Sequence, residues 1–274
     1  MKLLKPIIAI PSYKRPNASI FSKLENVGLE TYVFVRAEEK EMYPSEVTRI
    51  VISNVANIGE TRKKLASWCN RRGIDWVFMF DDDIRKVENR VKVGSEWKCR
   101  RIIEQPHKSP SFEKHALVHW YKTAKAYNLA LSSPSTRTEY RRNKFELTIN
   151  SGQCIQCVLL HIPSIIEVGN YRSTLEVGAE DIHIQYKLML EGYNTGVIHN
   201  IEYDCPAVGK GEGGNNAVEN LNLLQRYRNY TATFQENVAA DMNLVQIKET
   251  KTGLPSIKFN WRNWGGKKIE SICY

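Results

Sequence analysis

The chain has 274 residues, of which 42% are hydrophobic and 25% charged, so it can bury a full core as one large α/β domain or as one domain with appendages. It contains no run of 18 apolar residues and no leader-like pattern, so we expect neither a membrane span nor a cleaved signal peptide. The formal net charge is +9, and six dispersed cysteines favour a reducing cytoplasm over a disulfide-stabilised secreted protein.

The first part of the chain alternates strand and helix patterns. Apolar runs typical of buried strands cover residues 6–11, 31–35 and 48–52, and helices are predicted over residues 16–28 and 60–72. This alternation predicts a mostly parallel sheet, whose ligands bind beyond the carboxyl ends of the strands. The polar residues expected at that edge are Tyr13, Lys14, Arg15, Glu38, Asn57, Gly59 and Arg62.

A further buried strand begins near Asp75 and delivers Asp81, Asp82 and Asp83 to the same edge. In an extended chain Asp81 and Asp83 would point to one side and Asp82 to the other. Because three adjacent carboxylates repel one another, a hard divalent cation with oxygen ligands would stabilise them. A solvated acidic turn that caps the next element is the alternative interpretation.

Positive charge is concentrated between Arg85 and Lys144, where 15 Lys and Arg stand against five Glu and no Asp, while the remaining residues carry 24 basic and 25 acidic side chains. We predict a helix over residues 111–131 and interpret the segment as a basic helical insertion over the crevice. A polyanion such as nucleic acid would suit it, with Trp97 as a candidate for stacking on a base. A merely soluble basic surface is the alternative.

The remaining strands are predicted near residues 145–149, 154–161 and 196–203. Cys154 and Cys157 form a C-x-x-C pair, but a zinc site would need a second ligand pair at similar spacing, so we interpret them as buried thiols. A glycine-rich stretch over residues 209–216 is interpreted as a flexible lid, and a helix over residues 217–230 follows it.

Glu180 and Asp181 open a predicted helix that Gly192 ends. Carboxylates in a first helical turn are stabilised as anions by the free N–H groups and by the helix dipole. This position therefore favours an ionised base. Two ordinary acids that stabilise the helix are the alternative.

Four blocks occur in a fitting order: Ile-Pro-Ser-Tyr-Lys-Arg-Pro at residues 10–16, Asn-x-Gly-x-x-Arg at 57–62, Phe-Asp-Asp-Asp at 80–83, and Glu-Val-Gly, Glu-Asp and Leu-Glu-Gly-Tyr within 176–193. With them the chain resembles GT-A fold nucleotide-sugar glycosyltransferases over nearly its whole length. The first block, the aspartate strand and Lys-Gly-Glu-Gly-Gly-Asn at 210–215 look like the TET-associated glycosyltransferases of bacteriophages, which are thought to glycosylate hydroxymethylated pyrimidines in DNA.

The resemblance implies one GT-A domain, with a Rossmann-like, mostly parallel sheet flanked by helices. Residues 1–84 would form the nucleotide-sugar-binding half, and residues 85–144 the basic insertion that contacts the DNA acceptor. Residues 145–274 would form the acceptor-side half, with the Glu-Asp helix, the glycine-rich loop and a C-terminal tail.

The resemblance also implies roles for single residues. Asp81 would lie near the ribose and also belong to the metal site, where Asp83 would hold a Mn²⁺ or Mg²⁺ ion that bridges the diphosphate. Asp181, beside Glu180, would be the general base. His199 would correspond to a late metal-binding histidine, with a purely structural role as the alternative. The other nucleotide-sugar-binding residues would be Pro11, Ser12, Tyr13, Arg15, Glu38, Asn57, Gly59, Arg62 and Asp82.

The implied function is transfer of a sugar from a UDP-sugar to the hydroxyl of a 5-hydroxymethylated pyrimidine, 5-hydroxymethylcytosine in the first place, in phage DNA and hence in the host cytoplasm. One carboxylate base and one metal ion suffice for a single displacement with inversion. A retaining route is the alternative. Two other functions are a glycosyltransferase with a glycan or protein acceptor, and a DNA-binding protein with a decayed sugar-nucleotide site. The intact D-D-D and E-D pairs argue against decay.

Overall fold

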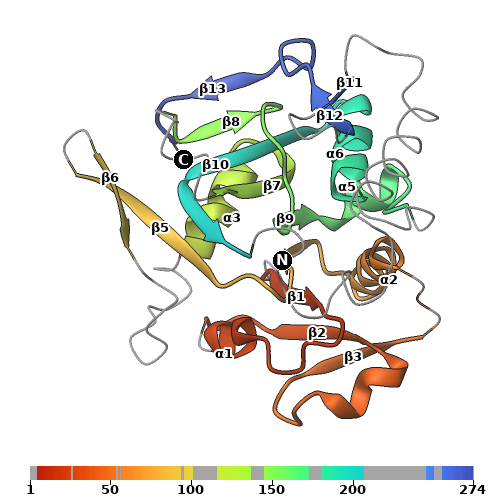
Figure 1. Ribbon diagram of the computed structural model, residues 1–274. Helices are drawn as coiled ribbons and strands as arrows, with labels where there is room; N and C mark the ends of the chain where they lie inside the picture. Colours follow the sequence, from red (N-terminus) through yellow and green to blue (C-terminus); the bar gives the residue numbers. More distant parts are fainter. Residues whose placement is uncertain are drawn as a thin grey trace.

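A computed structural model of the protein describes residues 5–25, 27–53, 55, 57–93, 96–100, 116–136, 145–172, 180–206, 245–249 and 255–273. Figure 1 shows how the elements follow one another. The strands are β1 Ile7–Pro11, β2 Thr31–Arg36, β3 Arg49–Ile52, β4 Trp76–Phe80, β5 Lys86–Val93, β6 Glu96–Arg100, β7 Leu129–Thr136, β8 Leu147–Ile149, β9 Cys157–His161, β10 Asn194–Asp204, β11 Val245–Glu249, β12 Pro255–Phe259 and β13 Lys267–Ile269. The helices are α1 Ser19–Glu25, η1 Ala37–Met42 (a 3₁₀ helix), α2 Ile58–Arg71, α3 Ala116–Ala126, α5 Ile162–Glu167 and α6 Glu180–Leu190.

Eleven strands form one mixed sheet, in the order β13-β8-β10-β7-β9-β4-β1-β2-β3, with β5 paired to β10 and β6 to β5. The strands β4, β1, β2 and β3 run parallel, as do β7 and β10. In between, β9 runs antiparallel to both β4 and β7. Helices cover the sheet, and the predicted α/β class is confirmed.

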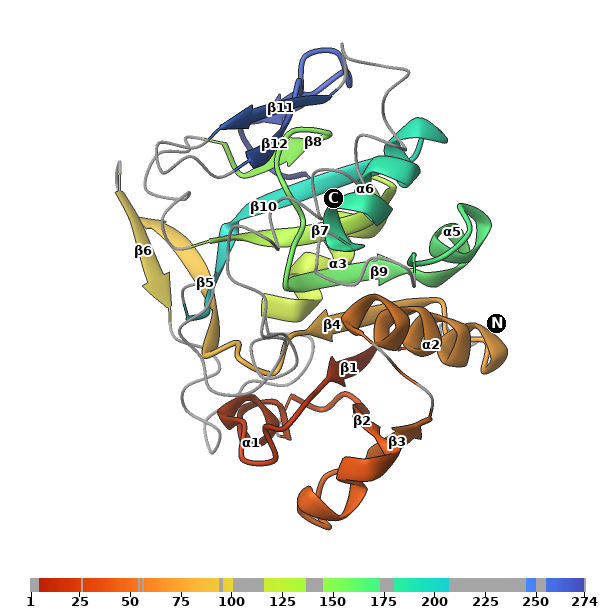
Figure 2. The same cartoon turned by 45° about the vertical axis from the view of Figure 1, so that its right-hand side comes forward.

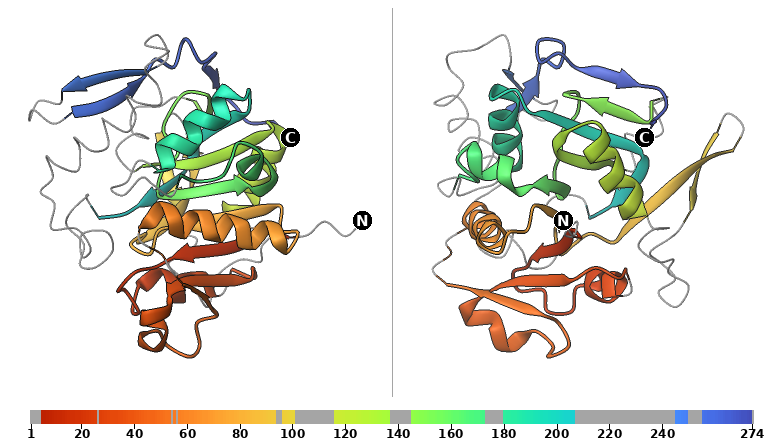
Figure 3. Two further views of the ribbon diagram at one scale, coloured as in Figure 1. Left: turned by 90° about the vertical axis from the view of Figure 1, so that its right-hand side faces the viewer. Right: turned by 180° about the vertical axis from the view of Figure 1, so that it is seen from behind.

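The sheet separates two apolar cores because successive side chains of a strand point to opposite faces. Phe78 and Phe80 of β4 enter one core, with helices α1 and α3, whereas Val77 and Met79 enter the other, with α2, α5 and α6. Figures 1 and 3 show α2, α5 and α6 grouped on one side of the molecule. This two-sided burial explains why β4 is apolar at every position.

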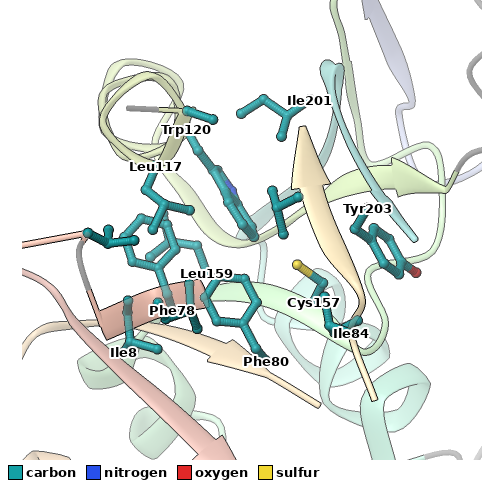
Figure 4. Close-up of a cluster of buried hydrophobic side chains, with 14 of the residues drawn as sticks. Ile8, Phe78, Phe80, Ile84, Leu117, Trp120, Cys157, Leu159, Ile201 and Tyr203 are labelled. Carbon is teal, nitrogen blue, oxygen red and sulfur yellow. The ribbon is translucent and has the colours of Figure 1, made fainter. Parts of the chain in front are cut away.

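The first core is built around Trp120 of α3, which is fully buried (Figure 4). Its ring packs against Phe78 with the ring centroids 5.1 Å apart, and its N–H donates a 2.8 Å hydrogen bond to the Ser132 hydroxyl. Leu117 and Ala124 of the same helix are also fully buried. The predicted apolar face of this helix therefore packs on the sheet.

The predicted end of that helix is wrong. The helix stops at Ala126, and Asn128 adopts a left-handed conformation with φ 50°. Residues 129–136 then form β7, which lies between β10 and β9 in the sheet and is buried along nearly its whole length. Leu131 continues the helical spacing of the sequence, but tertiary burial of this run favours a strand.

The segment 85–144 thus contributes α3 and β7 to the body of the fold, whereas strands β5 and β6 form a hairpin that projects from it (Figure 2). Trp97 lies on β6, paired with Lys92 in the ladder, and its side chain lies outside the described residues. So do the predicted glycine-rich lid and the predicted helix over residues 217–230. Cys154 and Cys157 are buried free thiols, as predicted. In the described ranges, none of the helices has the length and apolarity to cross a membrane.

Candidate active site

The three aspartates lie in a tight turn at the carboxyl end of β4. The N–H of Ile84 donates a 3.1 Å hydrogen bond to the Asp81 carbonyl, so the chain is turned here rather than extended. The predicted alternation of side chains is therefore wrong. Asp82 and Asp83 both form ion pairs with Arg15, and Asp81 contacts helix α2 instead.

Asp82 holds the loop that follows β1. The Ser12 hydroxyl and the Tyr13 N–H donate hydrogen bonds to its Oδ2, at 2.7 and 3.2 Å, and Arg15 forms a short ion pair with its Oδ1. The carboxylate is buried. Asp82 thus binds a loop made of residues that the sequence assigns to the nucleotide sugar.

Two aromatic residues fix the shape of this loop, which begins at Pro11, the last residue of β1. The Tyr43 hydroxyl donates a 2.8 Å hydrogen bond to the Ser12 oxygen. The Arg36 guanidinium lies 3.9 Å from the centre of the Tyr13 ring, within the range of a cation–π contact. Both sides of the loop are therefore ordered by protein contacts, and the Tyr13 ring forms part of its surface.

The acidic residue that faces this loop is Glu39 and not the predicted Glu38. Glu38 is exposed on the 3₁₀ helix η1, whereas Glu39 is buried and accepts a 2.7 Å hydrogen bond from the Lys14 N–H through Oε2. Its other oxygen, Oε1, is buried and has no hydrogen-bond partner among the described residues. Burial raises the pKa of Glu39. Which of the two neighbouring glutamates faces the loop depends on the register of η1, which the sequence pattern does not reveal.

Asn57 and Gly59 set the start of helix α2. The Asn57 side chain accepts a 2.9 Å hydrogen bond from the Glu60 N–H and so caps the helix. A Cβ atom on Gly59 would lie 2.6 Å from the Arg172 carbonyl and 3.5 Å from the Glu180 Cβ. The missing side chain therefore allows the first turn of α2 to approach the start of α6.

Arg62, one turn into α2, joins the two ends of the site. Its Nη2 lies 2.7 Å from Asp81 Oδ1, and its Nη1 forms short ion pairs with Glu180 and Asp181 of α6. Only 2% of its side chain is exposed. Burial lowers the pKa of this guanidinium, but the Asp81 and Glu180 carboxylates outweigh it and bring the pKa above its ordinary value. The predicted acid pair and the aspartate turn are thus brought together, with Arg62 between them.

Gln156, which the sequence did not single out, ties these elements through its backbone. It adopts a left-handed conformation with φ 61° just before β9. Its carbonyl accepts a 2.9 Å hydrogen bond from the Asp81 N–H, and its N–H donates to Asp181 Oδ2 at 3.4 Å. Its side-chain oxygen accepts from Cys205 at the end of β10. No periodicity or motif marks such a residue in the sequence.

Side-chain exposure divides the site into two groups. Asp83, Asp81 and Asp181 are 24%, 22% and 14% exposed, so a ligand can reach them. Asp82 and Glu180 are only 6% and 5% exposed. The first group is partly open to solvent, and the second is almost fully shielded from it.

Carboxylates outnumber cations in this cluster. Its members are five carboxylates and two guanidiniums, a formal charge of −3 when all are ionised: Asp81, Asp82, Asp83, Glu180, Asp181, Arg15 and Arg62. Burial raises the pKa of Asp81 to about 6, which Arg62 counteracts and Asp83 reinforces. Burial also raises the pKa values of Asp82 and Asp83. Because burial and mutual repulsion oppose full ionisation of these carboxylates, an additional cation bound among them would stabilise their charged forms.

One carboxylate oxygen of the turn is free to hold such a cation. Asp83 Oδ1 is buried and accepts no hydrogen bond from the described part of the chain. Within the same residues, no three or more His, Cys, Asp or Glu side chains group into a metal site, and this includes His199 with Asp81 and Asp83. Mg²⁺ is commonly held by one or two carboxylates together with substrate phosphates and water, and Asp83 fits that arrangement.

His199 has the surroundings of a structural residue. Its Nε2 lies 3.1 Å from the Thr148 hydroxyl, and Arg90 donates a 3.3 Å hydrogen bond to its carbonyl. Burial and the Arg90 charge lower its pKa to about 4. Strands β7 and β9 separate β10 from β4 in the sheet. The structural alternative therefore accounts for His199 better than metal binding does.

No family model matches the sequence, and no curated protein matches it either. Among solved structures, GalNAc-T7 with UDP, GalNAc and Mn²⁺ aligns with 85% of this chain at a TM-score of 0.50 and 11% identity, and this chain spans 48% of that protein's length. At 11% identity this match establishes the fold and nothing more specific. The fold is of the GT-A type.

Two further structures match at lower TM-scores. A197 from STIV covers 74% of this chain and 86% of its own length at 7% identity and a TM-score of 0.40. CMP:2-keto-3-deoxy-manno-octonic acid synthetase complexed with CTP covers 84% and 99%, at 14% identity and a TM-score of 0.43.

Proposed function

We propose that this protein is a glycosyltransferase that moves a sugar from a nucleotide-sugar donor, UDP-sugar in the first place, to an acceptor hydroxyl. The observation that carries the proposal is that the carboxylates of the aspartate turn lie next to Asp181 at one edge of a GT-A type sheet. Asp81 and Asp83 lie on the donor side, and Asp181 is joined to Asp81 through a single guanidinium. This supports a donor site and a base side by side.

On the donor side, the loop after β1 would receive the nucleotide. The Tyr13 ring offers an aromatic face, and the unpartnered oxygen of Glu39 can accept an N–H group of a base. Arg15, 16% exposed beside Asp83, can reach a diphosphate. A divalent cation bound at Asp83, with Asp81 beside it, would neutralise charge on the leaving nucleoside diphosphate.

On the acceptor side, Asp181 would take the proton of the attacking hydroxyl. Because a hydroxyl has a pKa far above neutrality, its proton must leave as the new bond to the anomeric carbon forms. The position of Asp181 in the first turn of α6 favours its anionic form. With Asp181 as the base, we propose displacement in one step with inversion.

We propose DNA as the acceptor, with 5-hydroxymethylcytosine as the modified base that the sequence resemblance implies in the first place. Support comes from the charge of residues 85–144, where 15 basic side chains stand against five acidic ones. Two strands of this segment form the hairpin that projects from the body close to the aspartate turn (Figures 1 and 2). A basic projection next to a donor site suits a phosphate backbone, and the binding would weaken with salt.

The test is mass spectrometry of nucleosides from hydroxymethylcytosine DNA incubated with the protein, Mn²⁺ and a panel of UDP-sugars. A hexose or pentose mass on the modified base establishes donor, acceptor and reaction class together. The D181N variant serves as the control for the reaction. Slow release of UDP without a modified nucleoside would remove DNA as acceptor, and no consumption of any donor would overturn the proposed function.

A further inference from the structure

We propose that Arg62 is a positioning residue that couples the donor side of the site to its base and touches neither substrate. The inference rests on the proposed function, because it takes Asp81 as a donor-side group and Asp181 as the base. It differs from the expectation that Arg62 binds the nucleotide sugar.

Burial separates Arg62 from the other arginine of the site. Arg62 is 2% exposed, whereas Arg15 is 16% exposed. Both terminal nitrogens of Arg62 are already occupied by protein carboxylates. Its Nε is buried and has no hydrogen-bond partner among the described residues. A phosphate group could reach Arg15 but not Arg62.

The two ends of the guanidinium hold elements that are far apart in the sequence. Nη2 binds Asp81, 19 residues away, and Nη1 binds Glu180, 118 residues away, together with Asp181. Because the guanidinium is planar and rigid, the position of the β4 turn fixes that of the first turn of α6. A donor that shifts Asp81 would therefore shift Asp181.

The packing around Arg62 favours this role. Asn57 caps α2, and Gly59 leaves room for the Arg172 carbonyl and the Glu180 side chain. Two segments, the β4 turn and the start of α6, therefore meet at a side chain that α2 holds in place. Removing one partner from a buried, hydrogen-bonded ion cluster leaves the charges of the remaining groups unpaired. The stability that each member contributes therefore depends on the others.

The first test compares R62K with R15K as a matched control, using calorimetric titration of UDP with Mn²⁺ and the kinetics of transfer. Lysine keeps the charge but lacks the fork that reaches two elements. We expect R62K to leave the Kd of UDP within about threefold and to lower kcat about 100-fold at unchanged donor KM, because misplacing a base by about 1 Å costs this much. R15K should weaken UDP binding about tenfold or more. If R62K weakened UDP binding as much as R15K does, the proposal would be overturned.

A second test needs no substrate and therefore separates this proposal from the proposed function. The variants D81N and E180Q, alone and together, are unfolded in urea in the native and R62K backgrounds. We expect the losses of unfolding free energy caused by D81N and by E180Q to be non-additive in the native background and additive in the R62K background. Additivity in both backgrounds would overturn the coupling, whether or not the protein binds UDP. Absence of UDP binding in the native protein would instead overturn the proposed function alone.

Discussion

The hydroxyl of Ser12 lies 2.7 Å from Asp82 Oδ2, although 70 residues separate them in the chain. The contact is possible because β1 and β4 are adjacent parallel strands whose carboxyl ends meet at one edge. Tyr43 completes the chain of hydrogen bonds by donating to the Ser12 oxygen. Both oxygens of Asp82 are thereby used to hold the loop, whereas Asp83 Oδ1 is buried without a hydrogen-bond partner among the described residues.

This relationship makes Ser12 important for stability. Replacing Ser12 with Ala leaves the buried Tyr43 hydroxyl without its acceptor, and we expect a loss of about 1–3 kcal/mol of unfolding free energy. Tyr43→Phe removes the same donor together with its need for a partner and should cost less. Urea unfolding measures both variants. A larger loss for Tyr43→Phe would contradict this account of the loop.

Asp83 should be required for metal-dependent binding of the donor. We expect Asp83→Asn to abolish the part of UDP affinity that depends on Mn²⁺, because it removes the negative charge at the buried, unpartnered Asp83 Oδ1. Asp75→Asn, an exposed position just before the same strand, is the matched control and should bind normally. Calorimetric titration of UDP with and without Mn²⁺ decides. An unchanged titration would remove Asp83 from the metal site.

Asp181 should be needed for transfer but not for donor binding. We expect Asp181→Asn to lower kcat by at least about 100-fold while UDP affinity stays nearly native, because the base acts on the acceptor. Glu191→Gln, exposed just past the other end of α6, is the control and should remain active. Transfer is followed by mass spectrometry and UDP binding by titration. Equal loss of both would argue that Asp181 belongs to the donor site.

His199 should make the protein sensitive to acid. Its pKa is about 4 in the folded protein, below the ordinary value, so the unfolded chain binds more protons between about pH 4 and 6.5. The resulting stability is complete above that window and is lost as the pH falls through it, by about 3 kcal/mol in total.

His199→Gln keeps a polar partner for Thr148 and does not titrate. Its unfolding free energy should therefore fall less between neutral pH and pH 4 than that of the native protein, since other groups such as Asp81 and His183 are common to both. Urea unfolding across this range measures the difference. Parallel curves would mean that His199 is not buried in its neutral form.

Much of this architecture follows from the sequence because it depends on long apolar patterns. The strands β1, β2 and β4 and the helices α2 and α6 begin and end close to their predicted limits. Chain order then suffices to bring the loop after β1 and the aspartate turn to one edge, since the parallel strands β1 and β4 share their carboxyl ends.

The details that the sequence did not predict depend on local geometry or on tertiary context. The choice of Glu39 over Glu38 follows from the register of one short 3₁₀ helix, and the placement of Asp82 follows from a single turn. Burial made a strand of Leu129–Thr136, although Leu131 matched a helical spacing. Gln156 acts through its backbone, which no residue pattern reveals.

The projecting hairpin grows directly out of the aspartate turn. Strand β5 starts at Lys86, three positions after Asp83, and the intervening Arg85 N–H is fastened to the Asp204 carbonyl at 2.8 Å. Arg90 then anchors the strand to Glu202 of β10 through a buried ion pair. If the acceptor binds this hairpin, as proposed above, its distance from Asp83 is set by a short stretch of backbone that these two contacts hold in place. An acceptor hydroxyl would then be accepted or rejected according to its distance from the segment bound at the hairpin.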